Sequence, residues 1–383
     1  MASDKKGFFG QLAQMDLWLA AAALTLVVIG QVMVYSSSVP VAMRRFGDPN
    51  HFAVRNLIFA MIGIIVATVI SRLSVESIRN LGRIGFWVSL MTLAIVLIPG
   101  LGIEGGGARR WINFRVFTIQ PSEPFKVLLV LFVAHVLETD PGRVLRIKGG
   151  LLPLLVLFGV AAAMLMSEPD FGATLISGTV VLGMVFVAGI PFAWIVFMIV
   201  AAIPAAAAGV IMAPYRFQRV MSFWDPWDDP QDSDFQLAQS LLSFGSGGIS
   251  GTGLGEGRQK QLYLPEAHTD FIFSVIGEEL GLFWILLIIA LFAAIIWRAF
   301  AIARSTPDPY VRLGAAGMGI LLGTQSIANM GVVMGLLPPK GLTLPLVSYG
   351  GSSLIITLSI IGLLLAFSRT VPPQHHASRV GRE

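Results

Sequence analysis

The sequence predicts an all-α polytopic membrane protein, and three observations support this fold class. Hydrophobic residues make up 55% of the 383 positions, charged residues make up 13%, and the mean hydropathy is +0.78. These values lie far outside the range of soluble domains. Apolar runs of about 20 residues, the length that crosses a hydrocarbon core, recur along the chain. One long polar segment interrupts them, at about 214–271.

About ten transmembrane helices can be placed on these apolar runs. The closely spaced pairs on either side of Glu168 and of Gly189 also permit a re-entrant hairpin. An even number of spans places both termini on one side of the membrane. The expected spans are approximately 16–38, 53–71, 83–100, 121–138, 150–167, 171–189, 191–213, 272–300, 310–336 and 345–367.

The two ends of the chain and the basic residues set the expected orientation. Residues 1–15 contain two lysines but no signal-peptide cleavage pattern, so an uncleaved cytoplasmic N-terminal segment is expected. The short loops at 72–83 and 138–148 are basic, which places them and both termini in the cytoplasm. The tail at 369–383 is predicted to be cytoplasmic and disordered. The chain has no cysteine, which excludes disulfides and thiolate metal sites.

Basic residues on the opposite, outer face need a separate explanation. Arg109 and Arg110 follow three glycines and precede Trp111, an arrangement that suits a lipid phosphate at the membrane interface. Outer loops also tolerate basic residues without any anionic partner, and this alternative stays open.

The outer loop at about 214–271 is predicted to contain a short helix and a glycine-rich stretch. Asp234 is placed as an N-cap, and the apolar residues that follow it favour a helix lying in the membrane interface. The glycine-rich stretch at 245–257 suits a backbone that bends closely around a ligand, or a flexible linker. Nucleotide binding is disfavoured because no strand precedes the glycines and no Gly-Lys-Ser/Thr follows them.

Ionisable residues in or beside apolar helices are candidates for function, because charge is expensive there. Asp270 stands at the start of a long apolar helix. Glu123 and Lys126 are three residues apart at the start of the fourth span, so they share a helix face and can pair. That pair either neutralises charge for membrane entry or holds a phosphate. Further candidates are Glu168 and Asp170 at a hairpin tip, Glu278 and Glu279 with a packing or relay role, and the Ser/Gly run at 348–353, which also suits close helix approach.

Six motifs occur in order along the chain. They are GARRWI, QPSEPFK, EPDFGATL, SLLSFGSGGISGTGLGEGRQK, YLPEAHTDFIFSVIGEELG and KGLTLPLVSYGGSS. Together they resemble the SEDS family of bacterial membrane proteins, and its division branch (FtsW) more than its elongation branch (RodA). The resemblance covers about 15–368, with the transmembrane domain expected at 16–368.

The resemblance implies a peptidoglycan glycosyltransferase that polymerises lipid II on the outer face of the inner membrane at the division septum, releasing undecaprenyl diphosphate. The implied partners are a cognate class B penicillin-binding protein (the transpeptidase), other division proteins and membrane lipids, and no nucleic acid. The implied catalytic residue is Asp270, the acid of the HTD motif, acting as general base. The substrate-binding residues expected from the motifs are Arg109, Glu123, Lys126, His268, Thr269, Lys340 and Ser352.

Two features of these residues qualify the chemistry. An aspartate in the first turn of a helix is stabilised as its anion and is therefore a weak base. Asp270 is thus expected to need desolvation by substrate or a nearby divalent cation, Mg²⁺ or Mn²⁺, whose ligands the sequence does not identify. His268 fits a capping or packing role as well as an assisting one.

Pro124 and Phe125 stand where relatives usually carry Leu-Ala. The Glu123 and Lys126 geometry is expected to survive, because proline is tolerated in a first helical turn. An elongation polymerase of the RodA type and a lipid II flippase remain as alternative functions. The matched broken helices of many transporters are not evident in the sequence.

Overall fold

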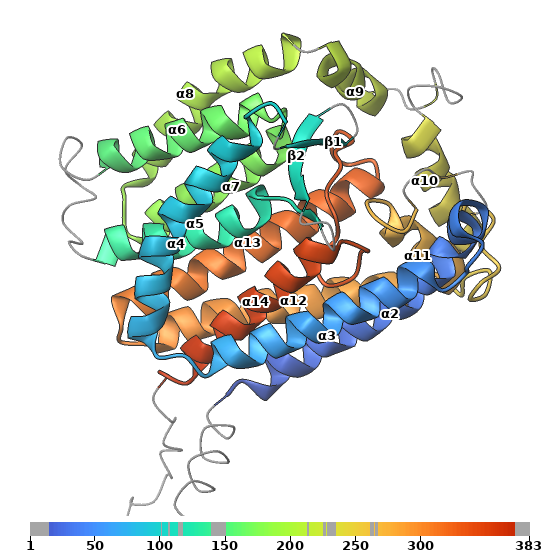
Figure 1. Ribbon diagram of the computed structural model, residues 1–383, viewed down its shortest axis with the longest axis horizontal. Coiled ribbons are helices and arrows are strands. Elements are labelled where there is room, and N and C mark those ends of the chain that lie inside the picture. The colour runs from blue at the N-terminus through green and yellow to red at the C-terminus, as the bar shows by residue number, and fades with distance from the viewer. Residues whose placement is uncertain are drawn as a thin grey trace, which may run out of the picture.

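Helices make up most of the regular structure in the computed structural model of the protein (Figure 1). The structure describes residues 15–371 except 101, 106–107, 114–117, 139–150, 213, 225–226, 228–234, 261–263 and 265–266. The elements are α2 (Leu17–Phe46), α3 (His51–Ser71), α4 (Val75–Val96), β1 (Ile103–Gly105), β2 (Ala108–Asn113), β3 (Thr118–Ile119), α5 (Ser122–Glu138), α6 (Leu152–Ser167), α7 (Phe171–Val187), α8 (Phe192–Ile211), α9 (Pro214–Trp224), α10 (Phe235–Gly247), α11 (Ile272–Leu280), α12 (Leu282–Ser305), α13 (Pro309–Val333) and α14 (Gly351–Ser368).

The predicted all-α polytopic class is confirmed at the level of the helices. Within the described residues, six helices are long and apolar enough to cross a membrane: α2, α3, α8, α12, α13 and α14. Two shorter apolar helices, α6 and α7, accompany them. The expected span at 121–138 matches α5, whereas the one at 83–100 only overlaps α4, which begins at Val75 and takes in most of the predicted loop at 72–83. Both helices fall short of the same criterion of length and composition.

Side-chain caps determine where several helices begin. Asp16 Oδ1 accepts from the backbone N–H of Leu19 (3.2 Å) at the start of α2, and Asp308 Oδ1 accepts from the N–H of Tyr310 (2.8 Å) at the start of α13. Each cap satisfies an amide that has no partner within its helix. At its other end α2 continues past the predicted boundary to Phe46, where Gly47 ends it with a φ of 69°.

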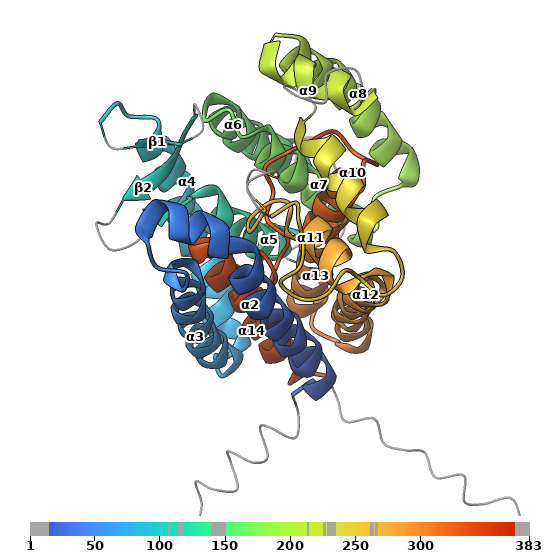
Figure 2. The same ribbon diagram turned by 90° about the vertical axis from the view of Figure 1, so that its right-hand side faces the viewer.

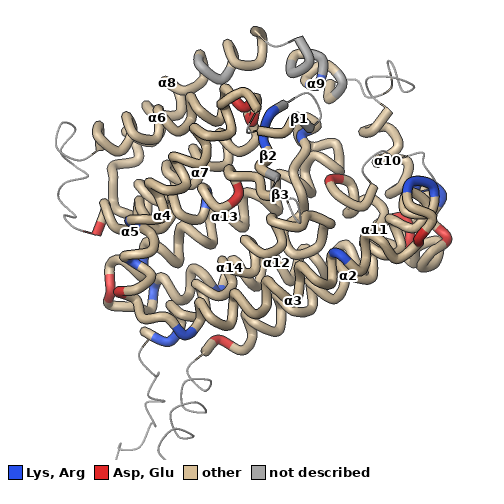
Figure 3. The backbone as a smooth tube through the Cα atoms, in the orientation of Figure 1, with Lys and Arg blue, Asp and Glu red and all other residues tan. Residues whose placement is uncertain are grey.

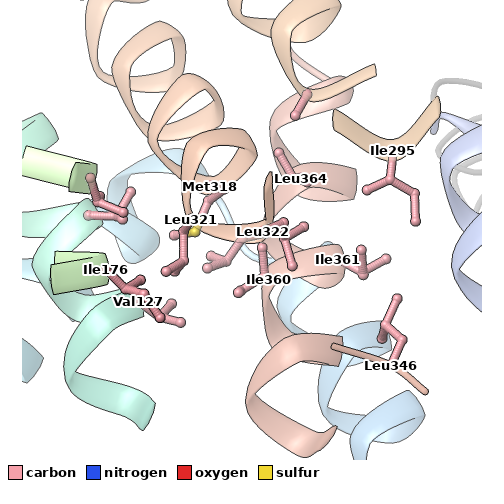
Figure 4. Packing of buried hydrophobic residues seen from close by; sticks show 14 of the residues in the cluster. Val127, Ile176, Ile295, Met318, Leu321, Leu322, Leu346, Ile360, Ile361 and Leu364 are labelled. Atoms are coloured by element: carbon pink, nitrogen blue, oxygen red, sulfur yellow. The ribbon is translucent and has the colours of Figure 1, made fainter. Parts of the chain in front are cut away.

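Helix α13 occupies the centre of the bundle. Figure 4 shows Met318, Leu321 and Leu322 of α13 lying between Ile360 of α14 and Val127 of α5. Lipid tails are as apolar as these side chains, so close packing rather than removal from water holds such helices together.

Glycines let α14 approach α3 closely. A Cβ on Gly362 would lie 2.6 Å from the carbonyl oxygen of Ala67, and a Cβ on Gly63 would lie 2.5 Å from Leu358 Cδ1. A substitution to alanine at either position would push the two helices apart and lose their dispersion contacts. Small residues therefore serve close packing between α14 and α3.

Both ends of the described chain lie at the same end of the bundle (Figures 1 and 2). The backbone N–H of Asp16 donates to Ser368 Oγ (3.2 Å), and Arg298 Nε donates to Asp16 Oδ2 (2.5 Å). We call this the terminal end, and we call the opposite end, where α14 begins, the site end. Charged residues gather near the helix ends and around β2, whereas α14 carries none (Figure 3).

The region before α12 differs most from the sequence expectation. The predicted continuous span at 272–300 is broken at Gly281, whose φ of 79° and ψ of −173° separate α11 from α12.

A small antiparallel sheet in the order β1-β2-β3, which the sequence analysis did not predict, lies between α4 and α5 in the chain. Helix α10 confirms the short helix predicted in the outer loop. Its proposed cap, Asp234, lies outside the described residues.

Candidate functional site

Asp270 lies in a turn at 267–271 that leads into α11. The expectation that it occupies the first turn of a helix is wrong, because α11 begins at Ile272 and its N-cap is Phe271. The carboxylate therefore stands before the helix rather than within its first turn, and the stabilisation of an anion by the helix dipole falls off outside that turn. The helix dipole therefore weakens Asp270 as a base less than the sequence analysis expected.

Asn329 of α13 fixes the backbone of this turn. Its Nδ2 donates to the carbonyl oxygen of Asp270 (2.8 Å) and also to the carbonyl oxygen of Leu342. The Asn329 side chain is buried and both hydrogen bonds are partly buried, so losing them is costly. One amide thus holds the Asp270 turn against the segment that follows α13.

That segment, residues 338–350, folds back across the site end and contains most of the KGLTLPLVSYGGSS motif, which spans 340–353. A Cβ on Gly341 would lie 3.0 Å from Asp270 Oδ2, so the carboxylate rests against a position where a side chain would crowd it. Leu346 adopts a φ of 64°, a left-handed conformation that is rare for leucine and concentrates at functional sites. The predicted span at 345–367 is wrong at its start, since α14 begins at Gly351.

The hairpin between α6 and α7 supplies a second carboxylate at the site end. Asp170 caps α7 by accepting from the N–H of Ala173 (3.0 Å). Its Oδ2 accepts from Gln120 Nε2 (3.1 Å) and from Ser122 Oγ (3.1 Å) at the start of α5. The EPDFGATL and QPSEPFK motifs therefore meet at one side chain.

Glu168 and Arg110 shape the same hairpin. Arg110 Nε donates to the carbonyl oxygen of Glu168 (3.0 Å), and Arg110 Nη2 donates to that of Pro169 (2.5 Å). The Glu168 side chain is 0% exposed, and neither carboxyl oxygen has a hydrogen-bond partner among the described residues. Burial, and then the nearby charge of Asp170, raises the pKa of Glu168 to about 8 against an opposing effect of Arg110.

The predicted pair on α5 is formed. Lys126 Nζ donates to Glu123 Oε1 (2.7 Å), and the Lys126 side chain is 3% exposed. Pro124 stands in the first turn of α5 without disturbing this geometry. Ser353 Oγ lies 3.4 Å from Glu123 Oε2 and 3.2 Å from Thr343 Oγ1, which connects the pair to the segment at 338–350.

His268 lies in an aromatic cluster. Its ring centroid is 4.7 Å from that of Phe52 and 5.6 Å from that of Tyr349. The carbonyl oxygen of His268 accepts from the N–H of Tyr349 (3.0 Å). These contacts are those of a packing residue that anchors the HTD turn to the segment before α14.

The other predicted residues lie around this centre. Lys340 Nζ lies 4.8 Å from the centroid of the Phe171 ring, beside Asp170. Thr269 and Ser352 are partly exposed. Arg109 is exposed on β2, while its neighbour Arg110 is the arginine that reaches the hairpin.

The glycine-rich stretch docks on the break between α11 and α12. The N–H of Gly255 donates to Glu279 Oε2 (3.0 Å), and the N–H of Arg258 donates to Glu278 Oε1 (2.8 Å). These amides thus bind the protein's own carboxylates. Glu278 and Glu279 therefore have the packing role, because they hold the glycine-rich stretch and the residues that follow it. Gly251 is needed at its position, because a Cβ there would lie 2.2 Å from the carbonyl oxygen of Glu279.

Sequence reasoning missed two residues that organise the site. Asn329 lies in a long apolar helix, and a buried amide in such a helix is a signal that could have identified it. Arg110 was grouped with Arg109 as a phosphate ligand, because spacing alone does not show that neighbouring strand residues point to opposite faces of a sheet.

The fold and this polar centre define an integral membrane protein whose charged and amide side chains converge at one end of the helix bundle. Comparison with known proteins identifies the family. The chain belongs to the family described as cell cycle protein, FtsW/RodA/SpoVE, which matches residues 16–372.

Curated relatives carry the name probable peptidoglycan glycosyltransferase FtsW. The relative from Geobacter metallireducens is 42% identical over 358 residues, covering 94% of this chain and 96% of its own. The relative from Methylococcus capsulatus is 43% identical, covering 91% of this chain and 89% of its own.

Two solved structures share the fold. A chain from a study of how a peptidoglycan synthase complex coordinates polymerization and crosslinking gives a TM-score of 0.75 at 30% identity, covering 93% of this chain and 98% of its own. The rod shape determining protein RodA of Thermus thermophilus gives 0.68 at 29% identity, covering 93% of this chain and 97% of its own.

Proposed function

We propose that this protein is a peptidoglycan glycosyltransferase that polymerises lipid II into glycan strands at the outer face of the cytoplasmic membrane, with Asp270 as general base. The observation that carries the proposal is the position of Asp270. The aspartate of the HTD motif rests against the segment at 338–350, which Asn329 ties to it and which also contacts the EPDFGATL motif through Lys340 and Phe171. The relatives named as glycosyltransferases match nearly the whole chain.

The proposed reaction joins two lipid-linked disaccharides. A sugar hydroxyl of the acceptor attacks the anomeric carbon of the donor, and the bond from that carbon to undecaprenyl diphosphate breaks. Asp270 takes the proton of the attacking hydroxyl. The leaving diphosphate departs as an anion and needs neutralising charge more than a proton, so one carboxylate and nearby cations suffice.

Lys340 is the cation best placed to bind that diphosphate. It lies in the segment at 338–350, and its neighbour Gly341 lies against the Asp270 carboxylate. Lys126 is paired to Glu123 (2.7 Å) and is buried, so we assign that pair to orienting the substrate-facing residues of α5 and α14. Arg109, exposed on β2, would contact the lipid phosphate nearer the membrane surface.

A divalent cation is proposed as an additional source of charge. Mg²⁺ is usually held by one or two carboxylates together with substrate phosphates. The described residues contain no group of three or more His, Asp or Glu that could hold a metal ion alone. The lipid diphosphate would therefore supply most of the ligands of such an ion, and the ion would neutralise the leaving group.

We further propose ten membrane spans with both termini in the cytoplasm, a class B penicillin-binding protein as partner, and action at the division septum. The common position of the termini supports an even number of spans. The basic residues at 72–83, around the connection from α3 to α4, support a cytoplasmic terminal end. The similarity to a chain of a peptidoglycan synthase complex supports the partner, and the FtsW relatives support the septum.

Polymerisation of fluorescent lipid II by the purified protein and its partner tests the proposed function. Glycan chains are expected from the unmodified protein and from Asp48→Asn, which removes another carboxylate near the site end. Asp270→Asn is expected to make none while melting at the same temperature. Full polymer formation by Asp270→Asn would refute the catalytic assignment. Lipid scrambling in liposomes by a protein that makes no polymer would favour a flippase.

A further inference from the structure

Asp170 makes more contacts than the capping of a helix requires. Its side chain is 6% exposed, with Oδ1 bound to the N–H of Ala173 and Oδ2 accepting from Gln120 and Ser122. An asparagine or a serine caps a helix as well as an aspartate does. All three donors are neutral, so none of them compensates the negative charge of Asp170 in its buried place.

Lys340 is the cation that faces this charge from the segment at 338–350. Its ammonium lies above the ring of Phe171, the residue that follows Asp170. The same two segments also approach each other at Gly172. A Cβ on Gly172 would lie 3.2 Å from Leu342 Cδ2 and 3.7 Å from Asp170 Oδ1. The segment that carries Lys340 is thus seated on the start of α7.

Burial and Asp170 act on Lys340 in opposite directions. Burial lowers the pKa of the Lys340 ammonium below its ordinary value of 10.5, and the charge of Asp170 raises it. Without Asp170, the ammonium would lose its proton at a lower pH.

Other ionisable groups surround this pair. Arg110 is bound to the backbone carbonyls of the α6 to α7 hairpin, and Lys126 is bound to Glu123. Glu168 is buried beside Asp170 and is neutral at pH 7, since its pKa is about 8. Asp270 lies against Gly341, on the other side of Lys340.

We propose that Asp170 is a positioning residue that keeps Lys340 charged and seated beside Asp270, so that Lys340 binds the diphosphate of the lipid-linked substrate. This inference rests on the proposed function and deepens it. Asp170 contacts the start of α5, its charge acts on the nearby Lys340, and it acts on the substrate through Lys340.

The charge of Asp170 can be separated experimentally from its capping role. Asp170→Asn keeps an oxygen for the Ala173 amide and removes the charge. Ser122→Ala removes one hydrogen bond to Asp170 and keeps the charge. Lys340→Arg keeps a cation that stays protonated at every accessible pH.

Binding of farnesyl diphosphate to the purified full-length protein, measured from pH 6.5 to pH 9.5, tests the proposal independently of turnover. Asp170→Asn is expected to weaken binding at pH 9 by at least about threefold and at pH 6.5 by less than about twofold, because the ammonium is charged at low pH in both proteins. Ser122→Ala is expected to follow the unmodified protein. In the Lys340→Arg background, Asp170→Asn is expected to cause no pH-dependent loss.

Three results would overturn the inference. They are an Asp170→Asn titration that matches the unmodified protein, a loss equal at all pH values that persists with Lys340→Arg, and no effect of Lys340→Met on binding. The polymerisation assay separates this failure from failure of the proposed function. An unmodified protein that polymerises lipid II while Asp170→Asn binds normally refutes the positioning role alone, whereas loss of polymerisation in every preparation refutes the function.

Discussion

The buried ion pair that fastens the glycine-rich stretch offers a quantitative test of the structure. Lys260 Nζ lies 2.6 Å from Glu279 Oε1, and the two side chains are 7% and 0% exposed. Ser36 Oγ donates to Glu279 Oε2 (2.7 Å) and accepts from Lys260 (3.0 Å), and the N–H of Gly255 also donates to Glu279 (3.0 Å). The segment that precedes the Asp270 turn is therefore tied to α2 and α11 by one buried network.

Removing one partner should cost much more than removing both. Breaking a buried ion pair leaves an uncompensated charge and costs about 3–5 kcal/mol. Two hydrogen bonds to Glu279 persist in Lys260→Met, so its cost should fall near the lower end, at about 3 kcal/mol. In the double variant Lys260→Met/Glu279→Met no charge remains at this site. Only the hydrogen bonds that Ser36 and Gly255 donate to Glu279 are lost, at a cost of about 1 kcal/mol each.

Unfolding in mixed micelles by sodium dodecyl sulphate, followed by tryptophan fluorescence, measures these free energies. The double variant is expected to be more stable than either Lys260→Met or Glu279→Met, with a coupling energy of at least about 4 kcal/mol. Limited proteolysis should cut the glycine-rich stretch faster in the single variants. Costs that add to within about 0.5 kcal/mol would refute the network, because independent sites behave in that way.

Three further substitutions have predicted outcomes. The pKa of Glu168 rises from 4.5 in the unfolded chain to about 8 in the folded protein, so the unfolded carboxyl releases its proton first. The stability contribution of Glu168 is therefore full below pH 4.5 and is lost as the pH rises through 8. Glu168→Gln should raise the melting temperature at pH 9 and have little effect at pH 5, and equal gains at both pH values would contradict this. Asn329→Ala should cost about 2–3 kcal/mol in the unfolding assay by leaving two partly buried carbonyls unpaired, and a neutral result would count against its bridging role. Gly281→Ala should lower the melting temperature and loosen the glycine-rich stretch, because its φ is 79° and its Cβ would lie 2.4 Å from the N of Gly251; an unchanged proteolysis pattern would argue otherwise.

Much of the fold follows from local sequence. The apolar runs are long enough to identify the helices, and the three-residue spacing of Glu123 and Lys126 fixes their shared face before any tertiary contact is known. Proline at 124 is harmless for a local reason as well, since the first turn needs no amide there. These features depend on residues close together in the chain.

The organisation of the site depends on contacts between distant residues. Asn329 and Leu342 meet Asp270 only after α13 and the segment at 338–350 have packed, and no periodicity encodes that return. The break at Gly281 is stabilised by Gly251, which lies 30 residues earlier in the chain. The glycine-rich stretch fits a ligand site by composition, and the carboxylates that fill it come from α11.

Lipid II polymerisation by the purified complex with its transpeptidase, comparing the unmodified protein with Asp270→Asn, tests the central claim most directly. The substitution replaces one carboxylate oxygen with nitrogen and leaves the backbone bond from Asn329 in place. We predict glycan chains from the unmodified complex and a loss of at least about a hundredfold in rate from Asp270→Asn, the range that general base catalysis contributes. Equal rates from two equally stable complexes would contradict the assignment of Asp270 as the base.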